Sequence, residues 1–267
     1  MLIRVVLLVA LLAGIAIAAY ATGWLGGEVD EANAPCVART FEGNGFTVCL
    51  YDARRHDIAL EWADASGAPY RSFERYEQDR GSARVRFAMN AGMFHEDATP
   101  VGLYETNGKM VRALNTAAGT GDDNFTLKPN GVFFGDERGV GVATTEEFAA
   151  RNRAVRFATQ SGPMLVIHGQ LHPKFSADGP SRYVRNGVGA RNSQTALFVI
   201  SEDEVSFGKF ARFFRDVLHC DDALFLDGNV SSLWVPAQGR RDDAHLFGPM
   251  IVVSDRGLRS RQRRLTT

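Results

Sequence analysis

The sequence predicts an α+β fold: a single domain of mixed, largely antiparallel sheets with few helices and one βαβ crossover near the C-terminus. Short segments rich in β-branched and aromatic residues recur along most of the chain, separated by Gly, Asn and Asp. Apolar residues at helical spacing occur only in brief stretches. The 267 residues, 45% of them hydrophobic and 23% charged, have an ordinary globular composition and suffice for one sizeable domain or two small ones.

Strand patterns are followed by turn signals in most of the chain. Strands are expected at residues 46–51, 58–62, 85–90, 103–106, 109–111, 132–134, 164–167, 196–200 and 223–226. Helices are expected at residues 70–80, 145–153 and 207–218. Asn107-Gly108 is a strong hairpin signal, and Thr145 is placed to cap the second helix. The strand before residue 207, the helix after it and the next strand predict a right-handed crossover between parallel strands.

The N-terminal segment has the pattern of an export signal. Arg4 precedes an apolar run, and Ala19-Tyr20-Ala21 would serve as a small-x-small cleavage site. The apolar character extends to Leu25, which is long enough to span a bilayer if the segment is not removed. Residues 1–25 are therefore predicted to be a signal peptide or a membrane anchor, and residues 26–35 a linker. Both alternatives predict an exported, periplasmic or other extracytoplasmic domain, and the uncleaved one would associate it with the inner membrane.

The three cysteines fit an oxidising compartment. Cys36 and Cys49 flank a segment with a turn signal at residues 42–45, so two strands joined there would bring the thiols together. A disulfide between them is expected. Cys220 is left over and is interpreted as a buried thiol.

Charge and motif patterns exclude several functions. The formal net charge of −1 provides no general field for nucleic acid, which is not expected as a partner. His168 and His172 lack the Glu of a zinc-protease motif, no Cys pair has zinc-site spacing, and no nucleotide-binding loop is present, so neither metal nor cofactor is expected. The basic tail at residues 256–267 is interpreted as a solvated terminus, with contact to an anionic lipid or polymer as the alternative.

Asp227 is the strongest candidate for a functional residue. It ends an apolar strand and precedes a tight polar turn containing Gly228, Ser231 and Ser232. Ligands collect at the carboxyl ends of buried strands. The alternative is that Asp227 only forms the turn by bonding to its own backbone. The local sequence does not separate the two.

Three further elements end strands or open turns. Asn90 begins a block with Gly92, where a small residue allows close approach of the backbone. Gly162 precedes Pro163, and Arg185 carries the side chain best matched to a pair of phosphate oxygens. A tight bend, an ordinary turn and a surface arginine are the alternatives. All four elements could converge at one rim of the fold.

Together the four elements resemble the phosphodiester glycosidase family, in a bacterial branch whose members are mostly uncharacterised. The family blocks N-G-G-F-F, G-P, P-R-T-A-x-G and L-D-G-G-G-S-S correspond to residues 90–94, 162–163, 185–189 and 226–232. Their order and spacing agree, and the likeness defines a phosphodiester glycosidase-like domain at residues 36–255. The chain departs from the family pattern at the following residues: Ala91, Met93, Asn186, Gly187, Asn229 and Val230.

The resemblance implies hydrolysis of a sugar-1-phosphodiester, in which the sugar is released from a phosphate monoester. Asp227 would be the nucleophile or general base, and Arg185 would hold the departing phosphate. Substrate-binding roles are implied for the following residues: Asn90, Gly92, Gly162, Gly228, Ser231 and Ser232. Glu96 is the nearest candidate for a second, acid–base carboxylate. Two rivals stay open: a non-catalytic exported domain that binds glycan or phosphate, and an envelope protein held by its arginine tail.

Overall fold

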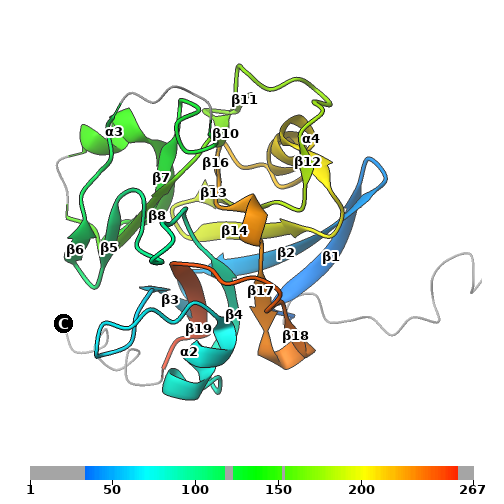
Figure 1. The fold of residues 1–267 in the computed structure, drawn as a ribbon. Coiled ribbons are helices and arrows are strands. Elements are labelled where there is room, and N and C mark those ends of the chain that lie inside the picture. The colour runs from blue at the N-terminus through cyan, green and yellow to red at the C-terminus, as the bar shows by residue number, and fades with distance from the viewer. Residues whose placement is uncertain (1–33, 118–122, 152–153, 258–267) are drawn as a thin grey trace, which may run out of the picture. The chain divides into compact units, whose positions relative to one another are not determined.

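The strands form three larger sheets and one two-stranded ribbon (Figure 1). The computed structural model describes residues 34–117, 123–151 and 154–257. Within these ranges, every pair of hydrogen-bonded neighbouring strands is antiparallel. From residue 35 onward, the described residues cluster as one compact unit, which agrees with the single domain predicted.

The largest sheet has seven strands. Their order is β1 (Cys36–Phe41), β2 (Asn44–Asp52), β14 (Thr195–Ser201), β13 (Asn186–Asn192), β16 (Asp222–Phe225), β10 (Met164–Ile167) and β11 (Gln170–Leu171). The β1–β2 hairpin pairs Cys36 with Cys49, and the predicted disulfide joins them. Cys220 is buried, as expected, and burial raises the pKa of its thiol to about 12.

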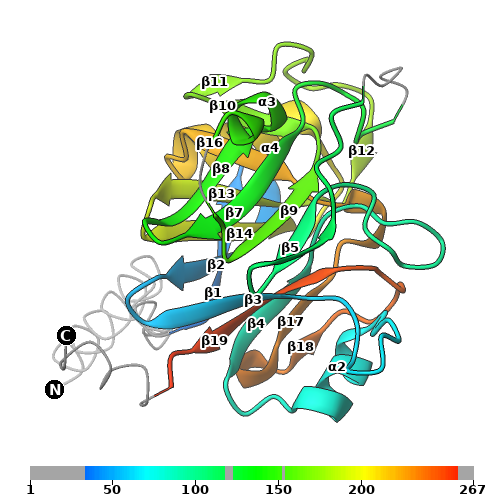
Figure 2. The same cartoon turned by 90° about the vertical axis from the view of Figure 1, so that its left-hand side faces the viewer.

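Two five-stranded sheets complete the β-structure with the ribbon. One has the order β18 (Arg240–Arg241), β17 (Leu233–Val235), β4 (Val85–Asn90), β19 (Met250–Asp255) and β3 (His56–Glu61). The other has the order β6 (Lys109–Arg112), β5 (Tyr104–Thr106), β9 (Phe157–Ser161), β7 (Gly131–Asp136) and β8 (Gly139–Thr144). The ribbon pairs β12 (Arg182–Tyr183) with β15 (Val205–Ser206). In Figure 2, the sheet that contains β4 lies below the other two, beside α2.

The helices in the described ranges are few and short, as predicted. The α-helices among them are α2 (Phe73–Arg80), α3 (Thr145–Ala149) and α4 (Phe207–Arg212), which continues as a π-helical turn at Phe213–Val217. Short 3₁₀ turns follow at Gly228–Val230 and Pro236–Gln238. The cap of α3 is Thr144 rather than the predicted Thr145. Thr144 and Glu147 form a reciprocal capping box, because the Glu147 carboxylate reaches back to the Thr144 backbone N–H.

The predicted crossover has one additional strand in its centre. β14 and β16 both pair antiparallel with β13, so they run parallel to each other, connected through α4. They are not neighbours, because β13 lies between them. The sequence prediction did not include β13. Its first residues follow Arg185, in an element that was expected to end a strand or open a turn.

The seven-stranded sheet is buried on both faces. Alternate residues of β2 and β14 belong to two core clusters, Phe46 and Val199 to one and Cys49 and Phe198 to the other. The first cluster contains the apolar side chains of α4, and the second contains residues of β4, β7 and β9. The other two sheets therefore share the core on the face opposite α4.

The terminal predictions lie outside the described part of the chain. This applies to the signal or anchor at residues 1–25, to nearly all of the linker, and to the basic tail beyond residue 257. Among the described residues, no helix is long and apolar enough to cross a membrane.

Candidate active site

The three larger sheets meet at the end of β16, where Leu226 and Asp227 leave the sheet. Asn90 is the last residue of β4, Asn186 the first of β13, and Ser161 the last of β9. The side chain of Ser161 donates a hydrogen bond to the Leu226 carbonyl oxygen over 2.5 Å. Each sheet thus contributes one strand end to this short segment. The four sequence elements converge here at one rim, as expected.

A buried amide network fixes the backbone of Asp227. The Asn186 Oδ1 accepts from the Asp227 N–H at 3.0 Å, and its Nδ2 donates to the Asn90 carbonyl oxygen at 3.0 Å and to the Asn90 Oδ1 at 2.8 Å. The Asn90 Nδ2 donates to the Asp227 carbonyl oxygen at 3.1 Å. The Ser232 N–H completes the network by donating to the Asn90 Oδ1 at 2.8 Å. Both asparagines are fully buried and hold protein groups, which leaves the Asp227 carboxyl outside the network.

The Asp227 carboxyl is partly buried and crowded. Burial raises its pKa to about 6, and a hydrogen bond from the Asn229 backbone only partly offsets this effect. The residue has an extended conformation at the start of the Gly228–Val230 turn. Its bond from the Asn229 backbone is the kind that the turn-forming alternative predicts, so the carboxyl is placed for that role as well. A carboxyl with this pKa is largely ionised at pH 7 and close to its titration midpoint, which suits a nucleophile or base.

Arg185 is a buried cation that pairs with no carboxylate in the described part of the chain. Only 1% of the residue is exposed. Its Nε donates to the Val205 carbonyl oxygen at 2.8 Å, and its Nη2 donates to the carbonyl oxygen and hydroxyl of Ser181. No described residue accepts a hydrogen bond from Nη1. Burial lowers the pKa of Arg185 to about 10, so the group keeps its charge at neutral pH.

Aromatic rings surround the guanidinium instead. Its Cζ lies 3.6 Å from the ring centroid of Phe207 and 5.6 Å from the centroids of Phe225 and Tyr183. Aromatic faces attract a cation without neutralising it. A charge held in this way stays available to an anion that approaches Nη1.

The register of β13 and β16 relates Arg185 to Asp227. Gly187 pairs with Phe225, and the Leu226 N–H donates to the Asn186 carbonyl oxygen at 3.1 Å. Arg185 immediately precedes β13, and Asp227 follows β16 after Leu226, so the two residues lie at adjoining ends of neighbouring strands. The two side chains form no ion pair, and neither is among the causes of the other's pKa shift. Neither charge is thus neutralised by the other.

The three predicted glycines are packed tightly against protein atoms. A Cβ at Gly92 would lie 2.5 Å from the Gln160 carbonyl oxygen, and one at Gly162 would lie 2.6 Å from the Asn130 Cβ. At Gly228 it would lie 2.9 Å from the Phe225 ring. These contacts explain the absence of a side chain by packing. Roles in substrate binding stay predictions.

Ser231, Ser232 and Glu96 differ in their position. The Ser231 Oγ lies 3.3 Å from the Val184 carbonyl oxygen and 3.4 Å from that of Asp227, and the Ser232 Oγ donates to the Val230 carbonyl oxygen. Both hydroxyls therefore stabilise the turn after Asp227. Glu96 is exposed in another loop, where its backbone oxygen accepts from Arg71, and its carboxylate contacts neither Asp227 nor Arg185. Its acid–base role stays a prediction.

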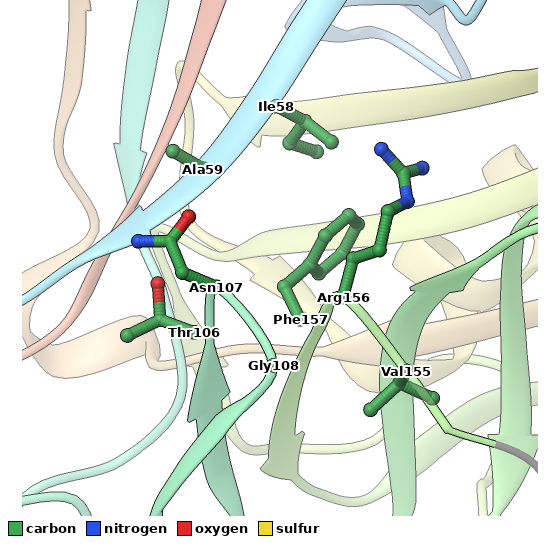
Figure 3. Close-up of a pocket in the computed structure, with 8 residues that line it drawn as sticks. All are labelled: Ile58, Ala59, Thr106, Asn107, Gly108, Val155, Arg156 and Phe157. Carbon is green, nitrogen blue, oxygen red and sulfur yellow. The ribbon is translucent and has the colours of Figure 1, made fainter.

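Three cavities lined by described residues lie away from the candidate site. One of about 380 Å³ lies between β3, the β5–β6 turn and the start of β9, where the Arg156 side chain and Asn107 line it (Figure 3). Two others, of about 350 and 330 Å³, also contain none of the residues predicted from the motifs. Because a large hollow does not by itself provide reacting groups, we assign the site from its charges and hydrogen bonds. No group of three or more His, Cys, Asp or Glu side chains in the described ranges is placed to bind a metal.

Sequence reasoning missed the importance of Asn186 and the aromatic residues. Asn186 was seen only as a departure from the family motif, although its amide connects β4 to Asp227. Phe207 was assigned to the apolar face of a helix, and Phe225 to a buried strand. Their stacking on a cation depends on tertiary contacts that no local pattern signals.

The model of the phosphodiester glycosidase family matches residues 83–254. The chain belongs to this family. It is also 32% identical over 201 residues to the uncharacterized protein YigE of Escherichia coli (strain K12), covering 75% of this chain and 78% of YigE. The family match contains the four motif blocks that resembled the family in sequence.

Two solved structures resemble the fold. One is the catalytic domain of zebrafish N-acetylglucosamine-1-phosphodiester α-N-acetylglucosaminidase, auto-inhibited by its pro-peptide, with a TM-score of 0.57, 14% identity and coverage of 83% of this chain and 82% of that one. The other is a hypothetical protein from Synechocystis, with a TM-score of 0.50, 15% identity and coverage of 83% and 61%, respectively. The first similarity confirms the predicted fold class.

Proposed function

We propose that the protein is an exported hydrolase that cleaves a sugar-1-phosphodiester and releases the sugar from a phosphate monoester. One observation carries the proposal. An ionisable carboxyl, Asp227, and a buried, unneutralised cation, Arg185, lie at adjoining ends of the neighbouring strands β16 and β13 without pairing. A phosphodiester linked to an anomeric carbon offers that carbon to Asp227 and a negatively charged phosphate to Arg185.

The chemistry requires a nucleophile and a place for negative charge. The bond between the anomeric carbon and the phosphate oxygen breaks, and the phosphate monoester leaves with the electron pair. Asp227 either forms a glycosyl ester that water then hydrolyses, or takes the proton of an attacking water molecule. Arg185 stabilises the charge that develops on the departing phosphate. Such a leaving group needs little protonation, so the distant, exposed Glu96 is assigned at most an auxiliary acid–base role.

Family membership and the disulfide support this proposal. Members of the family are phosphodiester glycosidases, and the name of the zebrafish enzyme specifies an N-acetylglucosamine phosphodiester. The Cys36–Cys49 bond fits an oxidising compartment outside the cytoplasm, in keeping with the N-terminal export pattern. The sugar and the aglycone are left open.

The test is the Asp227→Asn variant, assayed for sugar release on a panel of sugar-1-phosphodiesters that begins with N-acetylglucosamine-1-phosphate methyl ester. We expect a loss of about 10²–10⁴-fold in kcat, as for removal of a catalytic base. Asp221→Asn is the matched control, because Asp221 is an exposed carboxylate just before β16, at the end of the strand away from Asp227. Full turnover by a folded Asp227→Asn variant would contradict the assignment.

The non-catalytic alternative is tested in the same experiment. Asn229 and Val230 differ from the glycines of the family pattern, and Val230 packs against the apolar cluster of Tyr70 and Trp234. Binding of the panel compounds by the wild-type protein without sugar release would favour a glycan- or phosphate-binding domain. In that case Arg185→Lys should weaken binding, because lysine cannot reproduce the planar guanidinium.

A further inference from the structure

Tyr183 is unusual among the aromatic residues of the domain. Of the Phe, Tyr and Trp residues that the structure describes, it alone is classed as exposed, with 51% of its surface accessible. It belongs to none of the four apolar clusters of the core. Packing therefore does not explain why an aromatic side chain stands at this position.

The position of Tyr183 is at the edge of the candidate active site. Its ring centroid lies 5.6 Å from the Arg185 Cζ. The next residue, Val184, offers its carbonyl oxygen to the Ser231 Oγ at 3.3 Å, in the turn that follows Asp227. The exposed ring is thus held beside the guanidinium by the same short chain segment between β12 and β13 that contains Arg185.

The order of groups along the site follows from the backbone. Tyr183 and Arg185 are two residues apart in a chain segment that runs from β12 into β13, where alternate side chains share a face. Arg185 in turn precedes β13 at the end of the sheet where the neighbouring strand β16 leads into Asp227. A phosphate bound by Arg185 therefore has Asp227 on one side and the exposed ring of Tyr183 on another.

We propose that Tyr183 is a specificity-determining residue that stacks on a ring of the aglycone, the group that stays esterified to the phosphate. The proposal rests on the proposed function, which places the released sugar at Asp227. The aglycone then extends from the phosphate toward Tyr183. A flat aromatic side chain with one open face selects a partner with a flat, partly apolar face, such as a second sugar ring or a nucleobase.

The hydroxyl of Tyr183 is not needed for this role. No described residue forms a hydrogen bond with it, so Tyr183→Phe should preserve the preference, whereas Tyr183→Ala should remove it. Because the side chain is exposed and outside the core, neither change should affect folding. Met110→Ala is the matched control, since Met110 is 59% exposed on the edge strand β6, away from the motif residues.

The experiment compares three phosphodiesters of one sugar-1-phosphate, with N-acetylglucosamine as the first choice: a methyl ester, an ester to the 6-hydroxyl of glucose, and an ester to the 5′-hydroxyl of uridine. We expect the wild-type protein to prefer one ring-bearing ester over the methyl ester. Tyr183→Ala should lower kcat/KM for that ester roughly tenfold more than for the methyl ester, mainly through KM. The ring-bearing ester whose kcat/KM falls more in Tyr183→Ala identifies the aglycone. A larger fall for the glucose ester indicates a sugar, and a larger fall for the uridine ester indicates a nucleoside.

The outcomes separate this inference from the proposed function. If the wild-type protein cleaves the methyl ester but shows no preference for a ring, the Tyr183 inference is wrong and the function stands. An equal loss on all three esters in Tyr183→Ala also contradicts it, because the residue would then act only through Arg185. If the wild-type protein cleaves none of a full panel of sugars, the proposed function fails, and the inference that rests on it fails as well.

Discussion

The Asn186→Ala variant should lose both stability and activity, because this amide holds the backbone of Asp227. Asn186 is fully buried, and its side chain donates two hydrogen bonds to Asn90, accepts one from the Asp227 N–H and has the Ser231 Oγ 3.5 Å from its Oδ1. After truncation, the Asn90 Oδ1 keeps the Ser232 N–H as a donor. The Asp227 N–H and the Asn90 carbonyl oxygen lose a partner. At about 1–3 kcal/mol for each buried group left without one, the free energy of unfolding should fall by about 2–6 kcal/mol.

The loss of activity follows from position rather than from chemistry. Asn186 does not touch the reacting carboxyl, but the Asp227 backbone is free to shift without it. Since a displacement of about 1 Å can lower a rate about 100-fold, we expect kcat to fall by about that factor while the folded protein still binds the phosphodiester. Urea unfolding and steady-state sugar release on the same preparations measure the two effects.

Leu60→Ala provides a control in which the free energy of unfolding should fall by a similar amount. Leu60 is 1% exposed in β3, a strand that carries none of the candidate residues, and removing its side chain should cost about 2–5 kcal/mol. At a temperature where it is folded, its kcat should be that of the wild type. Equal kcat in Asn186→Ala and Leu60→Ala would refute a positioning role for Asn186. A change in unfolding free energy below about 0.5 kcal/mol would refute the hydrogen-bond network itself.

Two further predictions concern pH and redox state. Because Asp227 must be ionised to act, and burial raises its pKa to about 6, kcat/KM should be constant above about pH 7 and fall roughly tenfold by pH 5; a flat profile over this range would exclude Asp227 as the titrating group. Replacing Cys36 and Cys49 by Ala should lower the free energy of unfolding by about 3 kcal/mol, since the bond closes a loop with a sequence separation of 13, without changing kcat. A reductant should bring the wild type to the stability of that variant in urea unfolding, and an unchanged midpoint would contradict a stabilising bond.

Local patterns were sufficient for most strands and for the disulfide. The Asn107-Gly108 turn, with positive φ at both residues, forms the predicted hairpin between β5 and β6. The Cys36–Cys49 pairing also followed from one turn signal and its flanking residues. Both features depend on neighbours in sequence, and for that reason they could be predicted.

Features that depend on distant contacts were harder to predict. β13 begins at Asn186 with a Gly-rich sequence that resembles a turn. In the folded structure these glycines have a packing role instead, since Gly187 and Gly189 leave room for side chains across the sheet and from the helical segment that begins with α4. A Cβ at Gly189 would lie 2.7 Å from the Cys220 Sγ and 2.8 Å from Phe214. Low β-propensity is therefore overridden by tertiary packing, which a single sequence does not display.

The arrangement of Asn186 also explains how motifs far apart in sequence form one site. The Asn90 block ends a strand of one sheet, and Asp227 follows a strand of another, so a rigid connection between sheets must set their relative position. A fully buried side-chain amide can serve both, since it donates to Asn90 and accepts from Asp227 at the same time. Because the side-chain amides of Asn186 and Asn90 bond to one another and to backbone groups, the Asp227 carboxyl stays outside their hydrogen-bond network. Asn186, one of the six residues by which this chain departs from its family motif, is thus the residue that connects the Asn90 strand to the backbone of Asp227.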